Sequence, residues 1–330
     1  YMKNLLSAFI ALSLVMTLNL SYANEKPGKG VKVQALHSPI SEEAFQTMVL
    51  NEALHQLGYD VQDIKEVDYG AAYTSIANGD STYMAVNWFP LHNSMYDNAG
   101  GDKVFYREGF YIEGAIQGYL IDKKTANKYK INNIAQFKNA KVAALFDTDN
   151  DGKADLTGCQ AGWGCEGVIE YQLDAFKLGD RISHKQGQYA AIIADTIARY
   201  NEGDSIFYYT WTPYWVSGKL VPGKDVVWLE VPFSANPNGS DTSLSNGRNY
   251  GFDINSQRIV VNKVFAAKNP SAAKLFAVAK LAISDVSAEN MLIANGEDSQ
   301  KQIRQHALNW IKSNQAVFDV WLEAARKAGK

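Results

Sequence analysis

Both cysteines of the chain lie in one short segment, GCQAGWGCEG, which runs from Gly158 to Gly167 and places Trp163 between them. Its glycines allow the backbone to come close to a bound group, and the residues CEGVIEYQLDAF predict a helix that begins inside the segment. The N-terminus of a helix presents unpaired N–H groups and a partial positive charge, both of which favour a carboxylate. The segment therefore predicts an anion-binding backbone beside an indole ring.

Two further tryptophans stand at the ends of strand-like runs. Trp88, in AVNWFPLH, and Trp211, in YYTWTPYW, each come two positions before a proline, which stops a strand and starts a loop. Together with Trp163 they could enclose a quaternary ammonium ion, each indole face contributing ~0.5–2 kcal/mol. The alternative is that the three indoles cover the core independently. The tryptophans expected to be packing residues are Trp228, Trp310 and Trp321. The tyrosines that could add walls to a cage are Tyr69, Tyr73, Tyr209 and Tyr214.

His92 lies four residues after Trp88 and could donate a hydrogen bond to the same carboxylate, or it could be only structural. A cation cage beside an anion-binding backbone describes a site for a small zwitterion. Catalysis explains these residues less well, because the sequence holds no G-x-S-x-G or H-E-x-x-H motif and no phosphate-binding P-loop. A pair of Cys165 and His92 would need a free thiolate, which oxidation removes in an exported protein. We therefore expect a binding protein and not an enzyme, with a secreted hydrolase as the weaker alternative.

Residues 1–23 have the features of a secretory signal peptide: a positive charge, an apolar stretch over residues 5–20 and small residues before the cleavage site. Export to an oxidising compartment favours a disulfide between Cys159 and Cys165. In so short a loop the bridge would fix local shape more than overall stability. Two cysteines without clustered histidines argue against a zinc site.

The chain has 330 residues and a formal net charge of −3. Removing the signal peptide with its single lysine leaves 307 residues, with 31 basic against 35 acidic side chains. This balance gives no indication of a nucleic-acid partner. The length favours two domains of about 150 residues each.

Strand and helix patterns alternate along the chain, which is typical of an α/β fold. Strands are predicted over 31–38, 59–69, 82–89, 114–122, 141–147, 205–215 and 249–263. Helices are predicted over 42–58, 71–80, 133–139, 165–179, 189–204, 269–284, 287–296 and 299–329. Ser41 is expected to cap the first of these helices, which carries Glu42 and Glu43 in its first turn.

Two α/β units without a linker predict two lobes that are joined by crossing strands. The expected limits are residues 24–120 with 246–330 for the first lobe and 121–245 for the second, and the C-terminal helices return to the first. Ligands of open α/β sheets lie beyond the carboxyl ends of the strands. The tryptophans at the strand ends should therefore face the cleft between the lobes.

Over residues 24–330 the sequence resembles the periplasmic glycine betaine/proline betaine-binding proteins of osmoprotective ABC importers. The stretches that carry the resemblance are EVDYGAAYTSIANGD, AVNWFPLH, YREGFY, TGCQAGWGCEG, FYYTWTPYWV and KDVVWLEVPFSA. The resemblance implies a type II-like periplasmic binding protein of two α/β lobes, each a mixed sheet flanked by helices, between which the chain crosses twice. It also implies that a betaine is captured in the cleft and delivered to a membrane permease for osmoprotection. We expect a monomer without a cofactor.

The resemblance also assigns roles to individual residues. The positions that match the family's tryptophan box around the trimethylammonium group are Trp88, Trp163 and Trp211. The positions that match the ligands of the carboxylate are the side chain of His92 and the backbone N–H groups of Gly164 and Cys165. The cysteines that match the family disulfide are Cys159 and Cys165. Carnitine, ectoine and choline are alternative ligands, and choline is disfavoured because it lacks a carboxylate.

The same roles suggest an order of events during capture. In the open protein the ammonium group would bind on the indole faces of Trp88 and Trp211. Closure of the lobes would then bring Trp163 and the amides of Gly164 and Cys165 onto the ligand, and the exclusion of water would strengthen both electrostatic interactions.

An acidic segment, DTDNDGKAD, is typical of a calcium-binding loop. The side chains at loop positions 1, 3, 5 and 9 are Asp147, Asp149, Asp151 and Asp155, and position 6 is Gly152. Position 12 is Gly158 instead of a bidentate glutamate, so calcium binding is expected to be weak. The alternative is a solvated acidic turn.

Overall fold

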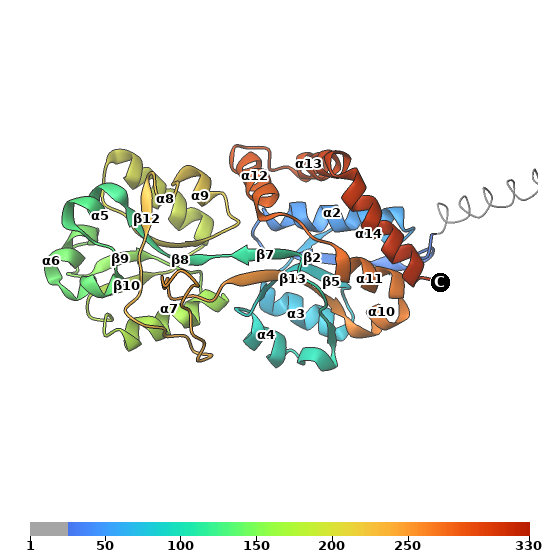
Figure 1. The fold of residues 1–330 in the computed structure, drawn as a ribbon, viewed down its shortest axis with the longest axis horizontal. Coiled ribbons are helices and arrows are strands. Elements are labelled where there is room, and N and C mark those ends of the chain that lie inside the picture. The colour runs from blue at the N-terminus through green and yellow to red at the C-terminus, as the bar shows by residue number, and fades with distance from the viewer. Residues whose placement is uncertain (1–25) are drawn as a thin grey trace, which may run out of the picture.

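The structure is a computed structural model that describes residues 26–330. The predicted signal peptide, residues 1–23, lies outside the described residues. The described chain forms two lobes joined by crossing segments, with the second lobe at the left of Figure 1 and the first at the right. Among residues 26–330 no helix combines the length and the apolar character that crossing a membrane requires.

The first lobe is built on a mixed sheet in the order β4-β2-β5-β13-β6, with β7 paired to β13. Its strands are β2 (Ala35–His37), β4 (Lys65–Glu66), β5 (Tyr83–Phe89), β6 (Phe105–Tyr106), β7 (Ile112–Ala115) and β13 (Asn255–Asn262). A separate parallel pair consists of β1 (Lys32–Val33) and β3 (Asp60–Val61). β2 runs parallel to β4 and β5, whereas β13 runs antiparallel to β5. Residues 83–88 of β5 are all buried, which explains why this run is mostly apolar and does not alternate.

Helices cover both faces of the first sheet, with α2 on one side and α3 and α4 on the other (Figure 1). The helical segments of this lobe are α2 (Glu43–Gln56), α3 (Tyr69–Asn78), α4 (Asn93–Asn98), η1 (Gly101–Lys103), α10 (Lys263–Lys268), α11 (Pro270–Val278), α12 (Ile283–Ala294), α13 (Gln300–Ser313) and α14 (Gln315–Ala328). α12 and α13 pack against α2, and α11 packs against α14. The C-terminal helices therefore return to the first lobe, as the sequence predicts.

The second lobe is built on a mixed sheet in the order β10-β9-β11-β8-β12. Its strands are β8 (Gln117–Asp122), β9 (Ala154–Thr157), β10 (Ile182–Lys185), β11 (Phe207–Trp211) and β12 (Val226–Trp228). Its helical segments are α5 (Lys123–Tyr129), η2 (Ile134–Lys138), α6 (Ala140–Ala143), η3 (Ala144–Phe146), α7 (Gly164–Ala175), α8 (Tyr189–Glu202) and α9 (Val216–Lys219). β9 runs parallel to β10 and β11, whereas β8 runs antiparallel to β11 and β12.

The chain crosses between the lobes from β7 to β8 and returns from β12 to β13 (Figure 1). β7 ends at Ala115 and β8 begins at Gln117, so the first crossing is almost continuous strand. The predicted architecture of two α/β lobes with mixed sheets is confirmed. The lobe limits at residues 120 and 245 stay a prediction.

The predicted strand over 141–147 is wrong, because this run forms α6 and η3 instead. The side-chain Oδ1 of Asn139 accepts a hydrogen bond from the N–H of Lys141 at 3.0 Å, which caps the start of α6. A strand-like apolar run of this length is compatible with a buried helical turn, and the cap decides between the two.

Two helix ends also differ from the predictions. Ser41 does not cap α2, because the N-cap residue is Glu42 and the carboxylate of Glu43 accepts from the N–H of Ser38 at 3.0 Å. The single helix predicted over 299–329 is interrupted at Asn314, which ends α13 and precedes α14.

Candidate functional site: a pocket between the lobes

A pocket lies between the two lobes. Its lining residues from the first lobe include Ile40, Tyr69, Trp88, Leu91, His92 and Asn255. Its lining residues from the second lobe include Gln117, Trp163, Gly164, Cys165, Tyr209 and Trp211. All six residues that the sequence proposes for ligand binding therefore meet at one pocket, although they come from three separate stretches of the chain.

Two of the three indoles belong to a single aromatic cluster in the second lobe. Trp163 is the N-cap residue of α7 and Trp211 ends β11. Their ring centroids lie 5.6 Å apart with the planes at 77°, and the ring of Tyr189 lies 4.7 Å from that of Trp211. The third indole, Trp88, is the penultimate residue of β5 in the first lobe. The cluster and the opposing indole thus stand on different lobes, as the chain order predicts.

This arrangement bears on the predicted order of capture, in which Trp163 arrives after Trp211. Trp163 and Trp211 contact each other within one lobe. The order in which the three indoles reach the ligand stays a prediction.

Helix α7 supplies backbone donors at the pocket. Its first two N–H groups belong to Gly164 and Cys165, and neither has an acceptor among the hydrogen bonds of residues 26–330. The preceding turn contains Gly162 at φ +84°, a left-handed conformation that favours glycine. Together with the partial positive charge of a helix N-terminus, the two N–H groups can bind a carboxylate.

A disulfide between Cys159 and Cys165 closes the loop that precedes α7, with the Cα atoms 5.9 Å apart. The predicted disulfide is confirmed. His184 holds the loop from outside: its Nε2 accepts from the N–H of Cys159 at 3.0 Å, and its Nδ1 lies 2.6 Å from the carboxylate of Glu170 on α7. Both cysteines are buried. The loop is therefore held by the disulfide and by the contacts of His184.

Reduction of this disulfide should weaken the binding of the expected zwitterionic ligand several-fold and leave the fold intact, because the bridge positions the N–H of Cys165 and closes only a short loop. Ligand titration before and after reduction measures the change, and thermal unfolding of both forms checks the fold. An unchanged affinity would make the bridge a purely structural one.

His92 is buried at the edge of the pocket, immediately before α4. Its Nδ1 lies 3.1 Å from the hydroxyl of Tyr73, and the ring of Tyr69 packs edge-on at a centroid distance of 4.4 Å. Burial lowers the pKa of His92 to about 3, so the imidazole is neutral throughout the physiological range. A neutral imidazole donates through one nitrogen only, which suits one hydrogen bond to a carboxylate.

The depressed pKa of His92 makes stability depend on pH. In the unfolded chain His92 takes up a proton near pH 6.5, whereas in the folded chain it stays neutral down to about pH 3. The stability that the neutral ring contributes is therefore present above pH 6.5 and lost as the pH falls towards 3. We expect the wild type to lose about 2 kcal/mol relative to His92→Gln between pH 7 and pH 5. Urea unfolding of both proteins at the two pH values measures this difference. Equal losses would contradict the neutral buried ring.

Comparison with a His92 variant is needed because two carboxyl groups titrate in the opposite direction. Burial raises the pKa values of Glu42 and Glu43 to about 7 each. Their contribution to stability is present below about pH 4.5 and lost as the pH rises through 7. These effects are common to both proteins and cancel in the difference.

Several residues in and next to the pocket lining were not predicted as parts of the site. Glu43 was predicted only to lie in the first turn of a helix, and its buried carboxylate accepts from the hydroxyl of Tyr69, which in turn accepts from Trp88 Nε1 at 3.2 Å. Nothing in the sequence distinguishes such a glutamate from a solvated one. Gln117 and Asn255 open the crossing strands β8 and β13, and a polar residue at the start of an apolar strand was a usable signal.

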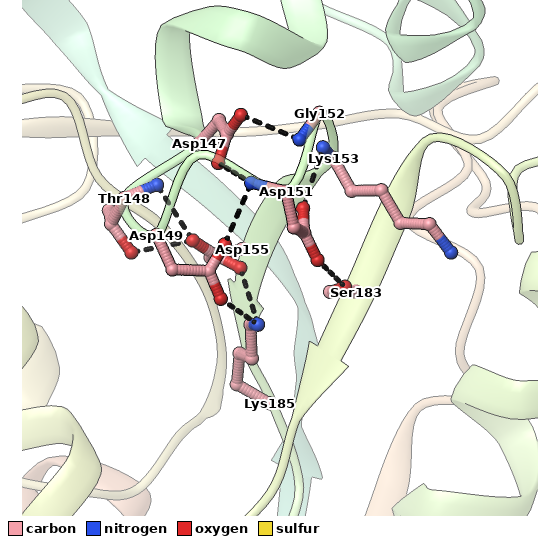
Figure 2. A network of polar contacts seen from close by, with 9 residues as sticks. All are labelled: Asp147, Thr148, Asp149, Asp151, Gly152, Lys153, Asp155, Ser183 and Lys185. Atoms are coloured by element: carbon pink, nitrogen blue, oxygen red, sulfur yellow. Dashed lines mark hydrogen bonds and ion pairs between the residues drawn. The ribbon is translucent and has the colours of Figure 1, made fainter.

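The acidic loop lies away from this pocket, between η3 and β9 (Figure 2). Asp147, Asp149 and Asp151 each place a carboxylate oxygen within 4.8 Å of the others. The carboxylate of Asp147 accepts from the N–H of Gly152 at 2.9 Å, and the N–H of Asp151 donates to both other aspartates at 3.2 Å. The loop therefore satisfies part of its charge with its own backbone.

The fourth predicted ligand, Asp155, does not join this group. It lies in β9, and its Oδ2 accepts from the N–H of Thr148 at 2.7 Å and from its hydroxyl. The ammonium of Lys185 lies 2.7 Å from Asp149 and 3.0 Å from Asp155, the second contact being an ion pair without hydrogen-bond alignment (Figure 2). Burial alone would raise the pKa of Asp155, but the hydrogen bonds from Thr148 and the positive charge of Lys185 outweigh it and lower the pKa.

Calcium at this loop stays a prediction. Lys185 already supplies a positive charge to two of the four carboxylates, which argues against tight binding. Calorimetric titration of calcium into the protein measures it directly. Heat that disappears in Asp147→Asn would confirm the site, and no heat at millimolar calcium would leave a solvated acidic turn.

Comparison with known proteins places the sequence in a defined context. Residues 32–313 match the model of the substrate binding domain of ABC-type glycine betaine transport systems. The chain is 57% identical over its full length to the glycine betaine-binding periplasmic protein OusX of Dickeya dadantii (strain 3937), whose full length it covers. It is 56% identical over 312 residues, 94% of each chain, to the glycine betaine/proline betaine-binding periplasmic protein of Escherichia coli (strain K12).

A solved structure shares the fold at lower identity. The lactococcal OpuAC protein, in its closed-liganded conformation complexed with glycine betaine, matches with a TM-score of 0.67 and 23% identity. The match covers 88% of this chain and 99% of that one. At this identity the likeness concerns the fold, and it agrees with the two lobes described above.

Proposed function

Because this chain belongs to the family of substrate-binding domains of ABC-type glycine betaine transport systems, we propose that it captures betaines of the glycine betaine and proline betaine type between its lobes. It then delivers them to the membrane permease of an importer, which supports osmoprotection. One observation carries the proposal: three indoles and two unpaired backbone N–H groups from separate parts of the chain line the same pocket.

In the proposed complex the two ends of the zwitterion meet different walls. The trimethylammonium group lies among the faces of Trp88, Trp163 and Trp211, which attract a cation. Because this group has no N–H donor, it loses no hydrogen bond in an aromatic cage. The carboxylate accepts from the N–H groups of Gly164 and Cys165 and from the imidazole of His92. Choline keeps the first set of contacts and forfeits the second.

The location proposed for this activity is the periplasm. The relatives at 57% and 56% identity are named periplasmic proteins, the first 23 residues have the pattern of a signal peptide, and a disulfide suits an oxidising compartment. We propose that the protein works there as a monomer without a cofactor, with the permease as its macromolecular partner.

A binding role also fits the chemistry of the pocket better than a catalytic one. Cys165 is held in a disulfide and has no thiolate to act as a nucleophile. The family is one of transport proteins that bind substrates. We therefore propose that the chain has no enzymatic activity, and that carnitine, ectoine and choline are the alternative ligands.

Titration of the mature protein with glycine betaine, choline and glycine, followed by tryptophan fluorescence, tests the function. Glycine betaine should give a saturable change, while choline and glycine should bind far more weakly because each lacks one half of the contacts. Equal responses to betaine and choline would keep the cage and discard the carboxylate site. No response to any of the three would refute the proposed function.

A further inference from the structure

A series of hydrogen-bonded polar side chains leads from the half-buried Arg107 to His92. Arg107, which follows β6, donates from Nη1 to Oδ1 of Asn87 at 3.1 Å. Nδ2 of Asn87 donates to the hydroxyl of Tyr73 at 2.6 Å, and that hydroxyl lies 3.1 Å from Nδ1 of His92. Asn87 and Tyr73 are almost completely buried, so water does not offer them other partners. None of these three residues lines the pocket.

The direction of every bond in this chain follows from its first member. A guanidinium has donors and no acceptor, so the atom of Asn87 that faces Arg107 must be the carbonyl oxygen. The amide nitrogen of Asn87 is thereby turned towards Tyr73, and an amide nitrogen only donates. The Tyr73 oxygen receives that hydrogen bond, and its own proton is left for the remaining neighbour, Nδ1 of His92. Were Nδ1 protonated instead, the buried phenolic proton would have no acceptor among the described residues, which is costly.

Arg107 itself is held in place by aromatic rings. Its guanidinium lies 3.7 Å from the ring centroid of Tyr96 and 5.0 Å from that of Phe89. A second hydrogen bond runs from its Nη1 to Oδ1 of Asn93 at 3.3 Å. Arg107, the first residue of this hydrogen-bonded series, is therefore held in place independently of the ligand pocket.

We propose that Arg107, Asn87 and Tyr73 are positioning residues that fix His92 as the tautomer with its proton on Nε2, so that this nitrogen faces the ligand carboxylate as a donor. Nδ1 accepts from Tyr73, and the single proton of the neutral ring must then sit on Nε2. No described residue forms a hydrogen bond with Nε2, and His92 lines the pocket. The part of the proposal that concerns the carboxylate rests on the proposed function, whereas the tautomer does not.

The sharpest test reverses the direction of the hydrogen bond between Tyr73 and His92 without removing either residue. In Asn87→Asp the new carboxylate accepts from Arg107 and can accept the proton of the Tyr73 hydroxyl. The phenolic oxygen then becomes an acceptor for Nδ1, the imidazole proton moves there, and an Nε2 lone pair faces the ligand carboxylate. We expect the affinity for glycine betaine to fall at least tenfold, since a donor is replaced by a repelling acceptor.

Asn93→Asp is the matched control. It adds the same charge beside the same guanidinium, but Asn93 has no contact with Tyr73, so the tautomer and the affinity should stay within about twofold of the wild type. Tyr73→Phe is a second variant that removes the donor to Nδ1 without adding charge. It should give a mixture of tautomers and an affinity about three- to tenfold lower. Thermal unfolding of all three variants checks that each is folded.

Nitrogen-15 NMR of histidine-labelled protein reads the tautomer in the absence of ligand, and His92→Gln assigns the signal among the five histidines. We expect a protonated Nε2 in the wild type and a protonated Nδ1 in Asn87→Asp. A protonated Nδ1 or a mixture in the wild type would overturn the proposal. So would a reversed tautomer with unchanged betaine affinity. If the wild type bound no betaine, the proposed function would fail while the NMR result still decided the tautomer.

Discussion

Replacing Trp163 with alanine should lower the affinity for glycine betaine by roughly two orders of magnitude, or about 3 kcal/mol. The substitution removes one face of the cation cage. It also opens the pocket beside Trp211, whose ring Trp163 contacts at 5.6 Å, so water reaches the ammonium group and weakens the remaining attraction. Calorimetric titration of wild type and variant with glycine betaine measures the loss.

Trp228→Ala is the control for this experiment. Trp228 also lies in the second lobe, in β12, where its ring packs 5.7 Å from that of Tyr250 and outside the pocket lining. It should bind betaine like the wild type despite a similar loss of packing. A change of less than about threefold in Trp163→Ala would show that the cage is the wrong description of the site.

Gly164→Ala should impair binding by a different route, by keeping the lobes apart. A methyl group on Gly164 would stand 2.9 Å from the carbonyl oxygen of Leu91 and 2.9 Å from its Cγ, closer than such atoms approach one another. Leu91 belongs to the first lobe and Gly164 to the second, so relief requires the cleft to open or α7 to shift. Overpacking of this kind costs about 1–3 kcal/mol, which corresponds to a loss of roughly 5- to 150-fold in affinity.

Gly167→Ala separates this effect from helix propensity. It makes the same substitution one turn later in α7, where a methyl group meets no atom within 4 Å. Affinity should be unchanged and stability equal or slightly greater, because alanine favours a helix over glycine. X-ray scattering with and without ligand measures closure directly. A Gly164→Ala variant that compacts on adding betaine as the wild type does would rule out the steric mechanism.

The fold could be predicted where the spacing of apolar residues and the prolines or glycines that end an element indicate the same boundaries. The apolar run of β5 ends at a proline, and helices α3, α7 and α8 begin and end close to the predicted residues. The segment 141–147 failed because a short apolar run fits a strand and a buried turn equally well, and the capping contact of Asn139 is a local detail. The break at Asn314 has the same character, since both halves of the predicted helix are strongly amphipathic.

The residues that line the pocket could be predicted from the sequence, whereas the buried residues that hold them in place could not. Tryptophans shortly before prolines and a glycine-rich turn before a helix can be recognised in the sequence. Trp88 and Trp163 lie at one pocket. The buried partners Glu43 and Asn87 cannot be recognised in this way, because a polar residue in a helix turn or a strand is ordinarily solvated. Only the packing of β5 against α3 and α2 shows that the side chains of Glu43 and Asn87 are buried and that both form hydrogen bonds with residues of the site.

The position of β13 has a consequence for the order in which the protein folds. This strand lies between β5 and β6 in the first sheet, and Ser256 pairs with Phe89 although a whole lobe separates them in sequence. As the chain emerges from the ribosome, every strand of the second sheet is complete by Trp228, whereas the first sheet lacks its central member until Asn262 has been made. The first lobe can therefore complete its sheet only after the second lobe has been made. For the proposed export of this protein across a membrane, late closure of its own N-terminal half would be an advantage.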